Sequence, residues 1–165
     1  MLAAAISVLA YAGNNSRYDE FMQRFRAAAS PQEEQRYLHA LPLFRAPALI
    51  EQTLIRTLSG EFRTQDAPFV LRTLMMTVHG REAAWNFVKT NWDAINRLFP
   101  PVGVRRMMEG ITGLATPELE RDVQQFVHDR HVELGGKTLA QYLEQLRIAV
   151  SLRERESTAL HEYLR

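Results

Sequence analysis

Apolar residues recur along most of the chain at spacings of three and four, which is the pattern of amphipathic helices. Alternating apolar and polar runs are nearly absent, and no Asn-Gly or Asp-Gly pair marks a β-hairpin turn. We therefore predict an all-α fold of about nine helices, with lengths typical of globular proteins. The expected ranges are 1–12, 16–29, 31–41, 47–58, 66–78, 80–99, 101–113, 117–133 and 137–162.

Capping side chains, proline and glycine mark the expected helix boundaries. Ser30 and Glu33 form a capping box at the start of one helix. Asp66 and Thr116 are the expected N-caps of two later helices. The expected first-turn prolines are Pro31, Pro47, Pro68, Pro101 and Pro117, and the expected stops are Gly13, Gly60, Gly113 and Gly135–Gly136.

The connections between the expected helices are short, so neighbouring helices should pack as antiparallel pairs. Stacked pairs of this kind form an irregular α-solenoid of the HEAT or armadillo type. No strict repeat is visible in the residues themselves, and no linker or low-complexity stretch divides the chain. We predict a single helical domain over residues 1–165.

The expected helix 80–99 carries both tryptophans of the chain, Trp85 and Trp92. A separation of seven residues is about two helical turns, so both rings should lie on one face with other apolar residues. An apolar stripe of this width can contact two neighbouring helices, as an inner helix of a solenoid does. We predict that both rings belong to the core rather than to a binding surface.

The charge balance narrows the classes of function. The chain has 20 Lys and Arg residues and 19 Asp and Glu residues, which gives a formal net charge of +1. This balance argues against a nucleic-acid or membrane-surface protein, which carries a basic excess on one face. Because cysteine is absent, disulfides and thiolate metal sites are excluded.

The apolar start of the chain, residues 1–13, resembles a signal peptide superficially. It lacks a basic n-region and a good small-residue cleavage site, and it is shorter than the roughly 20 residues that span a bilayer. We interpret it as an apolar helix that lacks its upstream neighbours, and as a surface through which the chain could dimerise. A cytoplasmic location is expected, with periplasmic and secreted locations as alternatives.

The residues offer no complete active site. His128 and His131 lie three apart on an expected helix, but no third metal ligand is evident. The tail begins like a zinc motif at His161, yet Arg165 occupies the position of the second histidine and cannot ligate zinc. Neither a nucleophile elbow nor a phosphate-binding glycine loop is present. For this chain alone we predict no catalytic, cofactor-binding or metal-binding residue, and a small self-contained enzyme stays as a third class of function.

Four segments carry a family resemblance. The segment GREAAWNFVKTNW, residues 80–92, matches the pattern G-R-x-x-A-W-x-F-x-K-x-N-W, and RTQDAPFV, residues 63–70, matches R-x-Q-D-x-x-x-V. Residues 11–21 and 30–41 keep the order and spacing of the same pattern. Together these segments resemble the C-terminal helical domain of zinc aminopeptidases of the aminopeptidase N type, a group that includes the puromycin-sensitive and endoplasmic-reticulum aminopeptidases.

The resemblance implies a bowl-shaped domain of irregular HEAT-like helix pairs. In such enzymes this domain closes over a zinc-containing catalytic domain and walls off the peptide cavity. The zinc ligands and the general base lie upstream, so zinc would belong to the parent enzyme and this chain would be the C-terminal part of a larger domain. The implied partners are the catalytic domain of the same polypeptide and the peptide substrate.

The resemblance also places two turns of this chain, around Pro100 and around Gly113, in the cavity wall. The expected wall residues are Phe99, Pro100, Arg105, Arg106 and Thr112. For Pro100, the alternative is a proline that only separates two helices. For the two arginines, the alternatives are a solvated face or an ion pair with Glu109.

We predict a non-catalytic C-terminal segment of a zinc aminopeptidase that removes N-terminal residues from peptides. The alternative is a free-standing helical-repeat scaffold that binds a protein or a peptide in its concave face. A free-standing solenoid needs polar helices at both ends. The apolar helix expected at residues 1–12 is a poor cap, and this favours the first function.

Overall fold

The computed structural model describes residues 2–164, which form ten α-helices, two 3₁₀ helices and no strand. The predicted all-α fold is confirmed. The helices are α1 (Leu2–Tyr11), α2 (Asn15–Arg26), α3 (Pro31–Leu38), η1 (Leu41–Leu43), α4 (Pro47–Leu58), α5 (Ala67–Met76), α6 (Arg81–Thr90), α7 (Trp92–Leu98), α8 (Pro101–Met108), η2 (Glu109–Gly113), α9 (Pro117–Asp129) and α10 (Thr138–Tyr163).

Local chemistry at the helix starts agrees with the sequence in all but one case. The Ser30 hydroxyl accepts a hydrogen bond from the Glu33 amide at 3.3 Å, and the Thr116 hydroxyl accepts one from the Leu119 amide at 3.3 Å. Asp66 is the N-cap residue of α5, as predicted, but its side chain makes no capping hydrogen bond. The reason is its backbone, which is already helical (φ −101°, ψ −35°) rather than extended as at a typical N-cap.

The predicted helix 80–99 is two helices, α6 and α7, separated at Asn91. The Asn91 backbone leaves helical geometry (φ −106°, ψ 17°), and its side-chain amide donates to the Phe87 carbonyl oxygen at 2.8 Å. A short polar side chain that bonds the backbone in this way competes with continued helix. The predicted core role of both tryptophans is still confirmed, because Trp85 is 0% exposed and Trp92 is 8% exposed.

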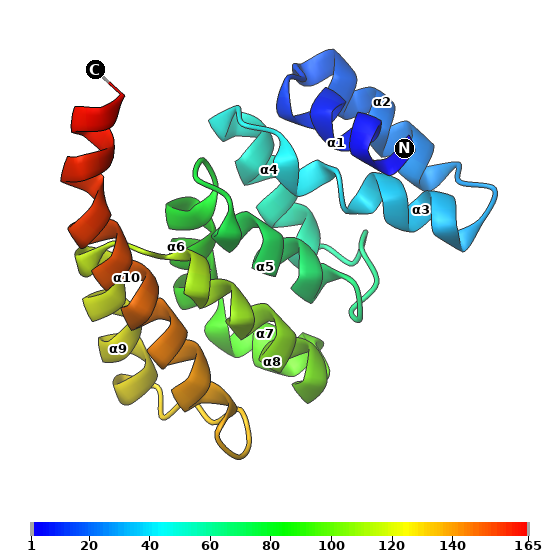
Figure 1. Cartoon of the computed structure of the whole chain (residues 1–165). Helices are drawn as coiled ribbons and strands as arrows, with labels where there is room; N and C mark the ends of the chain where they lie inside the picture. Colours follow the sequence, from blue (N-terminus) through cyan, green and yellow to red (C-terminus); the bar gives the residue numbers. More distant parts are fainter. Residues whose placement is uncertain (1, 165) are drawn as a thin grey trace.

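The helices follow one another through space in chain order (Figure 1). Helices α1–α3 form one end, α4–α8 form the middle, and α9 and α10 form the other end. Helix α5 is central and packs against α4, α6, α8, η1 and η2, while α10 packs against α9 and η2. Each pair therefore contacts mainly its neighbours, as expected for stacked helix pairs.

A regular offset relates the side chains that meet between successive pairs. Tyr18 bonds Thr53 at an offset of 35 residues, Trp85 bonds Asp122 at an offset of 37, and Arg153 bonds the Ala115 carbonyl at an offset of 38. Every side-chain hydrogen bond observed between distant residues of the described chain has an offset of 29 to 38. This near-constant offset is consistent with the predicted irregular solenoid, although the residues themselves show no repeat.

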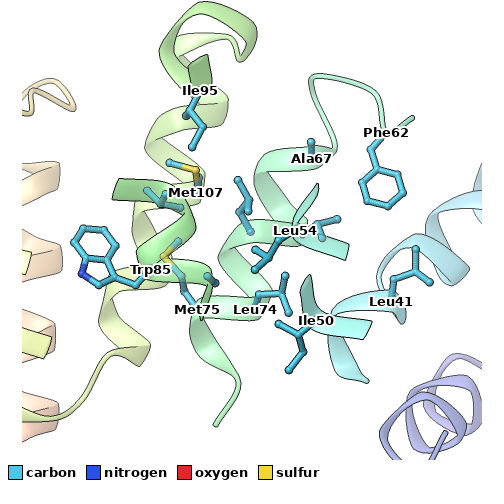
Figure 2. Packing of buried hydrophobic residues seen from close by; sticks show 14 of the residues in the cluster. Leu41, Ile50, Leu54, Phe62, Ala67, Leu74, Met75, Trp85, Ile95 and Met107 are labelled. Atoms are coloured by element: carbon cyan, nitrogen blue, oxygen red, sulfur yellow. The ribbon is translucent and has the colours of Figure 1, made fainter. Parts of the chain in front are cut away.

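The buried apolar side chains form one continuous cluster that runs from Ile6 in α1 to Val150 in α10. Figure 2 shows its centre, where side chains of α4, α5, α6 and α8 meet. The two buried polar side chains of the described residues, Thr53 and Thr57, both donate to backbone carbonyls of their own helix. The core therefore buries few polar groups, and these two are hydrogen-bonded.

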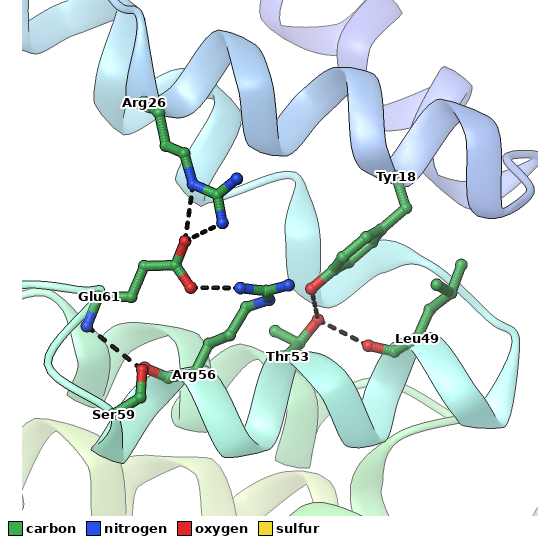
Figure 3. Close-up of polar contacts among 7 residues, drawn as sticks. All are labelled: Tyr18, Arg26, Leu49, Thr53, Arg56, Ser59 and Glu61. Carbon is green, nitrogen blue, oxygen red and sulfur yellow. Dashed lines mark hydrogen bonds and ion pairs between the residues drawn. The ribbon is translucent and has the colours of Figure 1, made fainter.

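A polar network joins the first helices to α4 (Figure 3). The Glu61 carboxylate accepts hydrogen bonds from Arg26 of α2, at 2.8 Å from its Nε, and from Arg56 of α4. Burial by itself raises the pKa of Glu61, but the hydrogen bonds and charges of the two arginines outweigh this and lower the pKa. The Tyr18 hydroxyl lies beside the network and contacts Thr53 at 2.9 Å, and burial raises its pKa. We call Arg26, Arg56 and Glu61 the Glu61 network.

The two terminal helices expose apolar side chains. In α1, Ile6 and Ala10 are buried while Val8 is 67% exposed. In α10, Leu146 and Val150 are buried, and the residues beyond Arg153 are mostly exposed and extend away from the body of the molecule (Figure 1). No helix among residues 2–164 has both the length and the apolar character needed to cross a membrane. Dimerisation through α1, the compartment and the single-domain organisation stay predictions.

Candidate cavity-wall surface

The five predicted wall residues belong to α8, η2 and the turn that precedes them. Pro101 begins α8 in the first-turn position that proline favours. Gly103 and Gly110 then allow close packing on α5, since a side-chain carbon at either position would lie 3.0 Å or less from α5 atoms. Helix α8 and η2 thus run along α5 in parallel, and α5 decides which α8 side chains face outward.

The two arginines of α8 lie beside different neighbours. The Arg106 guanidinium lies 5.4 Å from the centroid of the Phe69 ring in α5, a distance that allows a cation–π interaction. Arg105 reaches the loop between α9 and α10, where its Nη2 lies 3.4 Å from the position that a side-chain carbon on Gly135 would occupy. Both side chains are exposed. Within residues 2–164, neither arginine forms a salt bridge.

The other three wall residues are not brought together. Phe99 is only 4% exposed, so its ring packs in the core, and Pro100 beside it is half-buried. Thr112 lies at the far end of η2, roughly 20 Å along the helix axis from Phe99. It is half-buried, and its hydroxyl donates to the Glu109 carbonyl oxygen at 2.9 Å. A cavity role for all five residues stays a prediction, and Arg105 and Arg106 are the most accessible of them.

The alternative ion pair between these arginines and Glu109 is wrong. The Glu109 carboxylate instead accepts a hydrogen bond from Arg72 of α5 at 2.7 Å. The residues that complete this surface, Phe69 and Arg72, were missed by sequence reasoning because they lie far upstream of α8. Their offsets of 37 residues from Arg106 and Glu109 are the same as the offset that recurs through the fold. That offset is the signal that would have identified them.

The sequence motifs that suggested metal binding do not form a site in the described residues. Helix α9 ends at Asp129 rather than at the predicted 133, and His131 follows it in the left-handed backbone region (φ 48°). His128 is exposed and contacts Asp129 at 3.1 Å. Across residues 2–164, no three histidine or carboxylate side chains gather where they could hold a metal ion. Arg165, which ends the apparent zinc motif of the tail, lies outside the described residues.

A comparison with protein-family models agrees with the resemblance seen in the four sequence segments. Residues 1–148 match the family model described as the ERAP1-like C-terminal domain. The chain belongs to this family. The resemblance inferred from the four sequence segments is therefore confirmed over most of the chain.

Members of the aminopeptidase M1 group are similar to this ERAP1-like domain along its length. It is 31% identical to the leucyl aminopeptidase of Saccharolobus solfataricus over 131 residues, which cover 78% of this chain and 17% of that protein. It is 28% identical to aminopeptidase M1-B of Oryza sativa over 151 residues, or 89% of this chain. It is 24% identical to the mitochondrial aminopeptidase 2 of Saccharomyces cerevisiae over 163 residues, or 96% of this chain. The chain spans about a sixth of the length of these relatives.

Proposed function

We propose that this chain is the non-catalytic C-terminal segment of a zinc aminopeptidase that removes N-terminal residues from peptides. The observation that carries the proposal is membership of the ERAP1-like C-terminal domain family over residues 1–148, together with relatives named as aminopeptidases that are about six times longer. In this proposal the zinc ion, its ligands and the general base belong to the catalytic domain of the parent polypeptide. This chain packs against that domain and encloses the peptide.

Its contribution to the reaction is shape and charge. A closed wall keeps water out of the cavity, and charges inside a cavity of low dielectric constant act more strongly than in bulk water. Arg105 and Arg106 would offer guanidinium donors to carboxylates or carbonyl oxygens of a bound peptide. The Phe69 ring restrains Arg106, so less conformational entropy is lost when that side chain binds.

The proposal can be tested by grafting. The matching C-terminal segment of the S. solfataricus leucyl aminopeptidase would be deleted, and this chain would be joined in its place. Leucine release would be measured from a small aminoacyl reporter and from peptides of increasing length. We expect the deletion to change the dependence of kcat/KM on peptide length and the graft to restore it, because the wall limits which peptides the cavity accepts.

Single substitutions then locate the wall. Arg105→Ala, Arg106→Ala and Thr112→Ala in the graft should each alter the length dependence, while Arg97→Ala, an exposed arginine of α7, should not. Circular dichroism would establish that each graft is folded. A folded graft that behaves like the deleted enzyme would contradict the proposal and favour the free-standing scaffold. If a variant at Arg105, Arg106 or Thr112 left the dependence of kcat/KM on peptide length unchanged, that residue would not belong to the cavity wall.

A further inference from the structure

A small apolar pocket lies at the junction of three separate elements, and none of the five predicted wall residues lines it. The end of α1 contributes Tyr11, η1 and its following residue contribute Leu43 and Phe44, and the turn between α5 and α6 contributes Thr77, Val78 and His79. Its volume is about 210 Å³. This is below the ~300–1,000 Å³ typical of sites for drug-sized ligands, so it suits a single amino-acid-sized group.

The pocket is built from fixed parts. Phe44 is 2% exposed and belongs to the core. The Thr77 hydroxyl is occupied, since it donates to the Leu74 carbonyl at 2.9 Å and accepts from the Gly80 amide at 3.0 Å. Gly13 allows Phe44 to approach closely, because a side-chain carbon at that position would lie 2.5 Å from the Phe44 ring. The apolar surface is therefore held open by the packing around it.

Tyr11 and Val78 remain unusually exposed for their size, at 53% and 73%. The Tyr11 ring lies 6.2 Å from the His79 ring, and the two planes are inclined at 53°. Tyr11, Val78 and His79 line the pocket but leave it open to solvent. An apolar group placed between them would cover surface that is now in contact with water, which is favourable.

A positive charge is fixed beside the pocket. Arg45 donates from Nε to the Tyr11 carbonyl oxygen at 2.7 Å, and its guanidinium lies 4.4 Å from the centroid of the Tyr11 ring. These contacts orient the side chain but use only one of its five N–H donors. Arg45 forms no salt bridge with any described residue, and none of the pocket-lining residues is acidic.

We propose that this pocket binds an apolar side chain that carries a neighbouring carboxylate, with the apolar part between Tyr11, Val78 and His79 and the carboxylate on Arg45. The apolar walls and the oriented guanidinium complement the two halves of such a ligand. The shared chemistry is a carboxylate next to an apolar side chain, and the probes below distinguish a chain terminus from an acidic side chain as its source. The proposal uses α1, η1 and the α5–α6 turn, and it does not rest on the proposed cavity-wall function.

The test is an NMR titration of the full chain with small probes. N-acetyl-leucine, N-acetyl-leucinamide and N-acetyl-aspartyl-leucinamide would be added separately while the amide signals of Tyr11, Phe44, Val78 and His79 are followed. We expect roughly millimolar dissociation constants, because the site is small and partly open. A carboxylate probe should bind about 2- to 5-fold more tightly than the leucinamide, the range for one charge-assisted contact at an exposed site. Preference for the first or third probe identifies the source of the carboxylate.

Three variants make the test specific. Arg45→Gln should remove the preference for the carboxylate and leave leucinamide binding unchanged. Val78→Ser, at an exposed position, should weaken all three probes. Arg97→Gln, at an exposed arginine distant in sequence, should change neither the affinity for the probes nor the preference for the carboxylate. Equal affinity for acid and amide, retention of the preference in Arg45→Gln, or signals that move away from the pocket residues would each overturn the proposal.

Discussion

The Glu61 network provides a direct test of what holds the first helices to the rest of the fold. The substitution Glu61→Gln keeps the size of the side chain but removes its charge. It also replaces one carboxylate oxygen with an NH₂ donor, which cannot accept a hydrogen bond from a guanidinium. Either Arg26 or Arg56 then loses its partner. Because Arg56 is the more buried of the two, its loss should matter most.

The magnitude follows from the exposure of each arm. The Glu61 side chain is 21% exposed and that of Arg56 is 27% exposed, so their contact is shielded from water. A hydrogen bond to a charged group in such a place contributes about 1.5–3 kcal/mol. Arg26 is 54% exposed, and its arm is discounted to about 0–1 kcal/mol. Since Gln keeps one acceptor, we expect Glu61→Gln to lower the free energy of unfolding by about 2 kcal/mol.

The pH dependence has a defined sign. The pKa of Glu61 in the folded chain lies below its unfolded value of 4.5. A depressed carboxyl pKa means that the stabilisation is fully present above the unfolded value and is lost as the pH falls through the folded pKa. The difference in stability between the wild-type chain and Glu61→Gln should therefore be constant near neutral pH and shrink below pH 4.5.

Urea unfolding monitored by tryptophan fluorescence would measure these effects at pH 7 and at several lower values. Glu51→Gln on the exposed side of α4 is the matched control and should change stability by less than about 0.5 kcal/mol. If Glu61→Gln were as stable as the control at pH 7, the network would not be stabilising. If the difference persisted unchanged at pH 3, the charge of Glu61 would not be its cause.

Three further predictions concern packing and can be checked by the same unfolding assay. Gly113→Ala should cost about 2–3 kcal/mol, because its side-chain carbon would lie 2.7 Å from backbone atoms of Met75 and Met76. Gly136→Ala, in open space, should cost only about 1 kcal/mol for its positive φ, and equal losses would contradict the close approach of α5 and η2. Trp85→Phe should lower the free energy of unfolding by about 1–3 kcal/mol, because it removes part of a fully buried ring and the hydrogen bond from Nε1 to Asp122 at 2.7 Å. An unchanged stability would show that the packing of α6 on α9 does not depend on this contact. Leu146→Ala should lower the free energy of unfolding by about 2–5 kcal/mol, because Leu146 is buried. Leu152 is exposed, so Leu152→Ala should lower it by about 0.5 kcal/mol or less. The reverse order would mean that α10 packs through its other face.

For the candidate wall, residue patterns identify some of the exposed side chains but not the residues that surround them. Arg105 and Arg106 could be selected from the sequence because they follow a proline that begins a helix. Their surroundings could not be selected, because Phe69 belongs to a helix 37 residues upstream. The pocket beside Arg45 was missed for the same reason, since its lining comes from three elements that no local pattern connects.

The sequence by itself determined the helical class and the starts of nearly all helices, while the predicted ends of α2, α3, α8 and α9 lie three to five residues too far along the chain. First-turn prolines and capping hydroxyls act on the backbone within one helical turn, so Thr116 and Pro117 mark the start of α9 whatever packs against it. The break at Asn91 escaped detection because apolar spacing continues through it, while the backbone departs from the helix at a single residue. Its effect on the core is small, since Trp85 and Trp92 both still contact Phe126, with ring centroids 5.1 and 5.3 Å apart.

Only the tertiary structure decided which helices meet. The side chains that meet are 29 to 38 residues apart, from Tyr18–Thr53 at one end to Arg153–Ala115 at the other. The residue types at the matching positions differ, because packing requires complementary volumes and paired donors rather than identical side chains. A tyrosine meets a threonine in one pair, and a tryptophan meets an aspartate in another. The repeat of this protein therefore lies in the stacking of its helices, where sequence periodicity does not record it.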